Sequence, residues 1–177
     1  AWHWMHTTEK YAKGEVDVQS IHQVLHSYSQ YPTGAHKLFF TSNHDENSWN
    51  GTEYEKYGIA ALAWAVFAFT WHGMPMVYSG QESPSKKRLK FFDKDLIDWN
   101  NPSQLHGFYQ KLSLLRANNP AIFKGESFIL PSDKDNELMA FFRRSGNHIV
   151  LVLLNVSSHN RLRIHVHHDW LKGEFKN

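Results

Sequence analysis

The first apolar pattern in the chain predicts an amphipathic helix between Asp17, which can cap it, and Pro32, which it cannot pass. The apolar positions inside these limits recur at i, i+3, i+4 and i+7, the spacing of one helical face. These positions are Ile21, Val24, Leu25 and Tyr28. The helix is therefore expected to pack on a core with one face and to meet solvent with the other.

The next pattern predicts a strand, a helix and a second strand, which together form a parallel crossover unit. Residues 37–40 and 76–79 are short, mainly apolar runs of the kind found in buried parallel strands. Between them, Thr52 and Glu55 have the spacing of a capping box, which predicts an apolar helix that continues to about Phe69. Its apolar run, residues 58–69, is shorter than a membrane span, so we expect a buried helix and no membrane partner.

The last third of the chain changes from helical to strand periodicity. Asn101 and Pro102 can cap and open a helix that Asn119 and Pro120 end, and we place a domain boundary there. The expected apolar face of this helix is Leu105, Phe108, Tyr109, Leu112 and Leu115.

Beyond the boundary, an antiparallel β-domain is predicted. Residues 138–144 and 148–155 flank Ser145-Gly146-Asn147, which is a hairpin signal. Residues 162–166 alternate apolar and polar positions, as in a strand with one wet face. The predicted fold class is therefore α/β plus all-β, with residues 1–119 in the first domain and 120–177 in the second.

Composition narrows the function classes. The 177 residues are too few for a complete eight-stranded α/β barrel, which takes roughly 250. The net charge of +2, with His neutral, gives no broad basic field, so nucleic acid is not an expected partner. The absence of cysteine excludes disulfides and thiolate metal sites, and no signal peptide is visible, so the localisation stays open.

Two motifs carry the candidate chemistry, and each follows a predicted strand. The first, F-T-S-N-H-D at residues 40–45, places an imidazole and a carboxylate at the strand end, which is the active-site rim of a parallel α/β barrel. The second, G-M-P-M-V-Y-S-G-Q-E at residues 73–82, reaches the same rim. Together they resemble the F-x-x-N-H-D and G-x-P-x-x-Y-x-G-x-E patterns of the α-amylase family of glycoside hydrolases.

This resemblance implies a fold and a reaction. The expected fold is the C-terminal portion of a (β/α)8 TIM barrel, followed by part of an antiparallel β-sandwich domain. The expected reaction is retaining cleavage of α-1,4-glucosidic bonds in starch or maltooligosaccharides. The family's nucleophilic Asp and general-acid Glu have no matching motif in the sequence. The chain is therefore expected to be a fragment that is inactive alone, and its exposed barrel edges would favour an oligomer.

The resemblance also assigns roles to individual residues. Asp45 would hold hydroxyls of the reacting sugar and stabilise the transition state. The expected substrate-binding residues are His44, which would donate to the same sugar, Asn43, which would mainly orient the strand end, and Trp49, a candidate stacking platform. The expected structural residues of the rim are Tyr78, Gln81 and Glu82, with Glu82 a poor candidate for a second catalytic carboxylate.

No metal site or cofactor is predicted in this chain. His3 and His6 could share a helix face, yet no third ligand stands near them in the sequence, and zinc takes three or four. Calcium is common in the family, but its usual ligand positions belong to the part of the full-length enzyme that this sequence does not match.

Two other functions stay open at this point. One is a non-catalytic carbohydrate-binding or regulatory module that uses the β-domain and the aromatic residues of the chain. Such a module would still bind maltooligosaccharide after Asp45→Ala, whereas a rim site would not. The other is a transglycosylase or isomerase of the same superfamily, since transfer and hydrolysis share these motifs.

Overall fold

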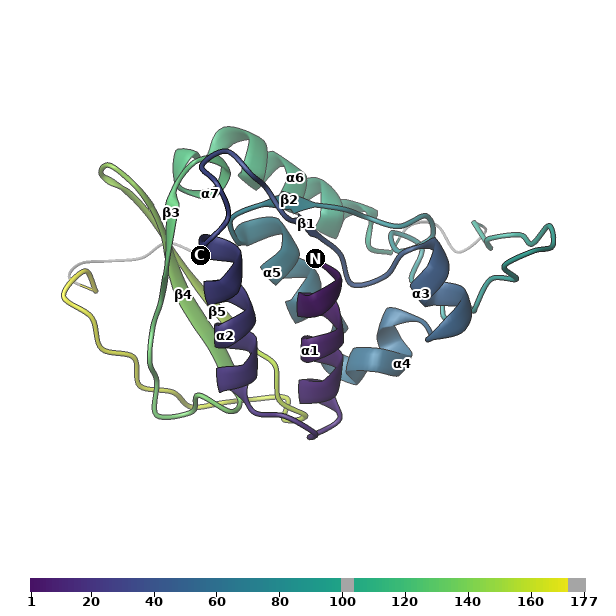
Figure 1. Cartoon of the computed structure of the whole chain (residues 1–177), viewed down its shortest axis with the longest axis horizontal. Helices are drawn as coiled ribbons and strands as arrows, with labels where there is room; N and C mark the ends of the chain where they lie inside the picture. The colour runs from purple at the N-terminus through teal and green to yellow at the C-terminus, as the bar shows by residue number, and fades with distance from the viewer. Residues whose placement is uncertain (100–103, 172–177) are drawn as a thin grey trace.

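The computed structural model describes residues 1–99 and 104–171, and it sets a three-stranded sheet beside a group of helices with α5 at their centre (Figure 1). The helices are α1 (Trp2–Ala12), α2 (Val18–Ser29), α3 (His44–Trp49), α4 (Glu53–Tyr57), α5 (Ala61–Thr70), α6 (His106–Asn118) and α7 (Pro120–Phe123), with a 3-10 turn η1 (Gly58–Ala60). The strands are β1 (Leu38–Phe39), β2 (Met74–Pro75), β3 (Glu126–Ile129), β4 (Leu138–Ser145) and β5 (His148–Asn155).

The predicted amphipathic helix is confirmed as α2. The Asp17 side chain accepts a hydrogen bond from the Ser20 backbone N–H at 3.1 Å, which satisfies a donor that the first helical turn leaves free. Ile21, Val24 and Leu25 are buried. The helix therefore covers the core with the face that its periodicity predicts.

The strand, helix and strand unit is confirmed, because β1 and β2 pair in parallel with Leu38 opposite Met74 and Phe39 opposite Pro75. The predicted position of the second strand, residues 76–79, is wrong by two residues. Met74 and Val77 are also exposed, since β1 is the only strand that pairs with β2 in the described chain. Two paired strands make no barrel, so the described residues show the predicted barrel portion only as this parallel unit.

The helix predicted from Thr52 to Phe69 is divided. The capping box is present, with the Glu55 N–H donating to Thr52 Oγ1 and the Thr52 N–H to Glu55 Oε2. However, α4 ends before Gly58, whose φ of +54° turns the chain into η1 before α5 begins. A glycine adopts this positive φ without the steric penalty of a Cβ, which explains the break.

Aromatic packing on α5 forms the main core. The Phe67 ring is fully buried and stacks on Trp4 and Trp71, with centroid distances of 5.1 and 5.2 Å, and it meets the edge of Phe141 at 5.5 Å. These contacts join α1, α5 and β4. The core thus crosses residue 119, and the boundary between two domains at that position remains a prediction.

The antiparallel part confirms the predicted hairpin. β4 and β5 pair from Leu138 opposite Asn155 to Ser145 opposite His148, and Gly146 takes a φ of +58° in the two-residue turn. The strand predicted at residues 162–166 is wrong, because only Val166 forms a bridge, with Ser132. The apolar side chains of that segment still pack on the sheet. Their alternation therefore reflects burial of one face of the segment and not backbone hydrogen bonding to a neighbouring strand. A single antiparallel sheet, and no second one, is present in the described residues where a sandwich portion was expected.

The helix predicted after residue 100 is α6, which begins at His106, and its expected caps, Asn101 and Pro102, lie outside the described residues. Tyr109 and Leu112 are buried against α5, as predicted, whereas Leu115 is exposed. None of the helices in residues 1–99 and 104–171 has the length and apolar character needed to cross a membrane.

A buried polar bridge fastens α4 to the ends of β1 and β2. Gln81 Nε2 donates to Thr41 Oγ1 at 2.9 Å and to the Glu53 carboxylate, and Gln81 Oε1 accepts the Tyr78 N–H at 2.7 Å. Burial raises the pKa of Glu53 to about 7, although the Gln81 hydrogen bond and the Lys56 charge oppose this rise. The bridge therefore contains a carboxylate that is easy to protonate near neutral pH.

We expect Gly73→Ala to lower the free energy of unfolding by about 1–3 kcal/mol. Gly73 has a φ of +139°, and a Cβ there would lie 2.6 Å from the Lys37 carbonyl oxygen and 2.7 Å from Phe39 Cε2. Urea unfolding followed by circular dichroism measures the change. The control is Gly107→Ala at an exposed position of α6, where a Cβ meets nothing within 4 Å. Equal stability of the two variants would show that the entry into β2 is not sterically constrained.

The unfolding free energy should fall as pH rises from about 4.5 to 7, because the folded chain holds the Glu53 proton more tightly than the unfolded chain. The stabilisation is complete below the unfolded pKa and is lost as pH passes the folded one. Glu53→Gln should abolish this slope and gain about 3 kcal/mol over the unchanged chain at pH 8. Glu55→Gln is the control, since the Arg88 hydrogen bond lowers the pKa of Glu55 to about 2, outside the tested range. An unchanged slope in Glu53→Gln would contradict the assignment.

Candidate functional site

The candidate site begins where the chain leaves β1 and enters the short helix α3. Asn43 is the N-cap of this helix, and its side-chain oxygen accepts the N–H groups of Asp45 at 3.0 Å and Glu46 at 2.9 Å. The cap fixes the first helical turn and so fixes the directions of His44 and Asp45. Asn43 itself is buried, which agrees with an orienting role better than with direct contact to a ligand.

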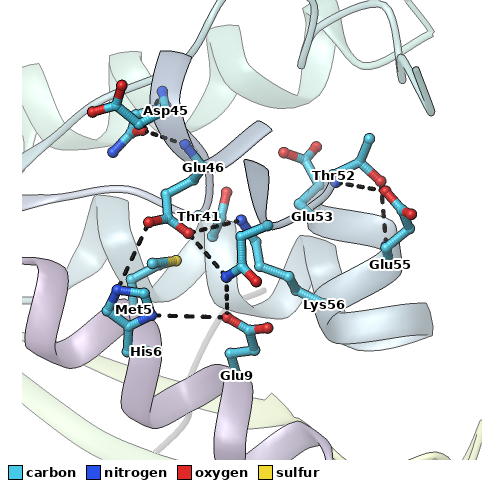
Figure 2. A network of polar contacts seen from close by, with 12 residues as sticks. Met5, His6, Glu9, Thr41, Asp45, Glu46, Thr52, Glu53, Glu55 and Lys56 are labelled. Carbon is cyan, nitrogen blue, oxygen red and sulfur yellow. Dashed lines mark hydrogen bonds and ion pairs between the residues drawn. The ribbon is translucent and has the colours of Figure 1, made fainter. Parts of the chain in front are cut away.

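His44 and Asp45 form a small polar patch that is open to solvent. Their side chains are 75% and 37% exposed, and His44 Nε2 lies 3.3 Å from Asp45 Oδ1. Figure 2 shows the Asp45 carboxylate pointing away from the buried network into which its neighbour Glu46 points. The pair offers a carboxylate acceptor beside an imidazole, which is the chemistry needed to hold neighbouring hydroxyl groups of one sugar.

Aromatic rings stand next to this patch. Trp49 ends α3 with 63% of its surface exposed, and its ring centroid lies 5.2 Å from that of Phe91 and 6.1 Å from that of Phe92. The Phe91 ring in turn faces the His44 imidazole at 6.5 Å. The sequence predicts Trp49 as a platform for stacking on sugar rings, but it does not assign Phe91 or Phe92 to the site. The signal that could have revealed them is an adjacent aromatic pair in an otherwise polar loop.

Polar contacts hold the loop that carries these two phenylalanines against α3 and α4. The Leu89 N–H donates to Asn47 Oδ1 at 2.7 Å, and Arg88 Nη2 pairs with Glu55 Oε1 at 2.8 Å. A cavity of about 210 Å³ opens between the loop and the strand ends, and His44, Tyr78 and Phe91 are among its lining residues. The structure thus brings residues from both motifs to one cavity.

The expected rim residues have different surroundings. Gln81 belongs to the buried bridge to Glu53, and Tyr78 lines the cavity beside His44. Glu82 is half-buried, and its Oε2 accepts no hydrogen bond from any described residue. Its backbone carbonyl accepts the Leu105 N–H at 3.1 Å, which ties the rim to the start of α6. A supporting role for these three residues stays a prediction.

Beneath α3, a network of buried charges joins this helix to α1 (Figure 2). Asn50 Nδ2 donates to Glu9 Oε2 at 2.7 Å and to Glu46 Oε2 at 3.0 Å. Lys13 Nζ lies 2.7 Å from Glu9, and Lys56 Nζ, almost completely buried, lies 3.9 Å from Glu46. Burial lowers the pKa of Lys56, and the nearby carboxylates oppose this effect.

One group of side chains with the ligand types that metals use lies within this network. The ligand atoms of His6, Glu9 and Glu46 are all within 4.8 Å of one another. Near His3 and His6 the sequence shows no third ligand, but the fold brings Glu9 and Glu46 close to His6. The negative charge of Glu9 is already opposed by Lys13 and that of Glu46 by Lys56. Asn50 also donates a hydrogen bond to one oxygen of each carboxylate. The cluster is therefore balanced without a cation, and the absence of a metal site remains a prediction.

The chain is similar to known proteins in sequence and in fold. No protein-family model matches the chain. Alpha-amylase 2 of Dictyoglomus thermophilum is 26% identical over 132 residues, which cover 68% of this chain and 22% of that protein. Alpha-amylase MalA of Haloarcula japonica is 27% identical over 137 residues, which cover 72% of this chain and 19% of that protein. The chain thus spans about a fifth of the length of these two curated relatives.

The fold is also found in a solved structure. The maltogenic α-amylase AmyB of Thermotoga neapolitana superposes with a TM-score of 0.75 at 23% identity, and the match covers 86% of this chain and 36% of that one. The two strand-end motifs and the sequence likeness to two α-amylases, together with this shared fold, support the identification of the chain as similar to part of an α-amylase-family glycoside hydrolase.

Proposed function

We propose that the patch formed by His44, Asp45 and Trp49 binds the glucosyl units of an α-1,4-glucan. The observation that carries this proposal is the pairing of an exposed carboxylate with an imidazole 3.3 Å away at the end of β1. The aromatic rings beside the pair offer apolar faces for a sugar ring. The likeness to proteins named as α-amylases supports an α-glucan or maltooligosaccharide as the ligand.

The patch would act on the charge that develops during glycoside cleavage. The transition state of a retaining glycosidase resembles an oxocarbenium ion, and hydrogen bonds to the ring hydroxyls strengthen as it forms. Asp45 would accept hydrogen bonds from hydroxyls of the reacting sugar, while His44 would donate one. Interactions of this kind lower the barrier because they are stronger in the transition state than in the ground state.

We propose that the 177-residue chain binds glucan but does not hydrolyse it alone. Asp45 stabilises charge in this mechanism, and it neither attacks the anomeric carbon nor protonates the leaving group. A retaining reaction needs, in addition to Asp45, one pair of carboxyl groups about 5 Å apart for those steps. The motifs that mark this pair in the family do not occur in the sequence.

A binding module that does not depend on Asp45 is the second candidate. The exposed aromatic group of Trp49, Phe91 and Phe92 favours it, because stacking on rings can hold a sugar without a carboxylate. In the first function the affinity for glucan depends on Asp45, and in the second it depends on the aromatic rings.

Asp45→Asn should weaken the binding of maltoheptaose to the purified chain about tenfold, since a hydrogen bond to a charged group contributes about 1.5–3 kcal/mol. Isothermal titration calorimetry measures the affinity, and exposed Glu15→Gln serves as the matched control. Unchanged affinity in Asp45→Asn together with loss in Trp49→Ala would favour the binding module. A reducing-sugar assay on the same samples should detect no release from starch, and release would contradict the proposed inactivity.

A further inference from the structure

A second cavity lies at the opposite ends of the two parallel strands from Asp45. Its volume is about 530 Å³, and its walls come from the loop after α2, the entries into β1 and β2, and the start of β3. Lys37 precedes β1 directly and His72 lies two residues before β2, so both stand at the amino ends of the strands. Neither the proposed glucan site nor any part of its mechanism uses this cavity.

Four of the side chains that line the cavity are cationic or can become so. Lys37, Lys124, His36 and His72 line it, and Glu126 is the only acidic residue among its described lining residues. The rings of His36 and His72 lie 5.2 Å apart. Protonation of either imidazole therefore adds positive charge beside two lysines.

Two arginine side chains add positive charge behind the cavity wall. Arg143 is fully buried and donates to Ser127 Oγ and to the Ile122 carbonyl oxygen at 2.8 Å, while its Nε has no hydrogen-bond partner among the described residues. Arg116 donates to the carbonyl oxygens of Phe69, at 2.9 Å, and Gly73. In the described part of the chain, no carboxylate lies within ion-pair distance of either guanidinium.

Uncompensated buried charge is unfavourable, because removal from water costs several kcal/mol per ion unless an opposite charge replaces the solvent. The titration of the neighbouring groups reflects this positive field. The pKa of His72 is lowered by burial first, and then by the charges of Arg143, His36 and Arg116. The pKa of Arg143 is lowered to about 10 by burial and by Arg116. Among the described residues that line the cavity beside these groups, Glu126 is the only carboxylate.

We propose that this cavity binds the phosphoryl group of a small molecule, or free phosphate, between His36, His72 and Lys124. A tetrahedral oxyanion can accept several charge-assisted hydrogen bonds at once and would balance the arginines behind the wall. Ser127, which Arg143 holds at the cavity wall, offers a further hydroxyl donor. The cavity is much larger than a phosphate ion, so it also has room for the remainder of a phosphate ester.

The test is a titration of the purified chain with inorganic phosphate at fixed ionic strength, followed by the NMR signals of His36 and His72. Binding predicts saturable shifts and a rise in the pKa of both imidazoles, because an anion stabilises their charged form. Chloride at the same ionic strength should produce neither effect. Non-saturable shifts, or equal shifts with chloride, would overturn the proposal. Repeating the titration with glucose 6-phosphate and with glucose tells a phosphate ester from free phosphate as the ligand.

Three exposed positions give matched variants. Lys124→Gln should weaken phosphate binding about tenfold, and Glu126→Gln should strengthen it, because the first removes a cation and the second removes the only lining acid. Lys111→Gln, an exposed lysine on α6 outside the cavity, should leave the affinity unchanged. Equal affinities for Lys124→Gln and Lys111→Gln would overturn the proposal. Thermal unfolding of each variant establishes that the fold is retained. The expected changes in phosphate affinity do not depend on whether the chain binds maltoheptaose.

Discussion

The packing of Phe67 is the constraint on which the rest of the structure depends. This one ring contacts Trp4 on α1, Trp71 in the turn toward β2, and Phe141 on β4. Because core side chains pack at the density of an organic crystal, these three contacts fix the relative positions of the elements that carry them. Both candidate sites are built from the end of β1 and the entry to β2. The positions of these segments therefore depend on one aromatic core.

The charged network under α3 fixes the position of the helix that carries the proposed glucan site. A six-residue helix has little stability of its own, since helix nucleation is unfavourable and few hydrogen bonds follow it. The Asn43 cap holds its first turn, while Glu46 and Asn50 attach its buried side to Glu9 of α1. The two consecutive residues thus have different roles: Glu46 is buried and anchors the helix, whereas the Asp45 side chain is exposed to solvent.

The two ends of the parallel strands differ in electrostatic character, and this difference separates the ligands proposed for them. At the carboxyl ends, Asp45 and His44 beside aromatic rings suit the hydroxyl groups of a neutral sugar. At the amino ends, histidines, lysines and the buried Arg143 suit an anion. Both sites lie on the loops that flank β1 and β2, so the same short strands position both.

The sequence alone determined those features whose interactions lie within a few residues of each other: the capping box at Thr52, the hairpin turn at Gly146, and the motif that ends at Asp45. Tertiary structure decided the rest. Residues 162–166 have the pattern of a strand but pack on the sheet without a ladder, because periodicity records burial and not hydrogen-bond partners. Phe91 reaches His44 and Trp49 only through its loop's contacts with α3 and α4, which no local pattern encodes. The physical reason is range: caps and turns are closed by neighbouring residues, whereas shared faces and paired charges depend on how distant segments pack together.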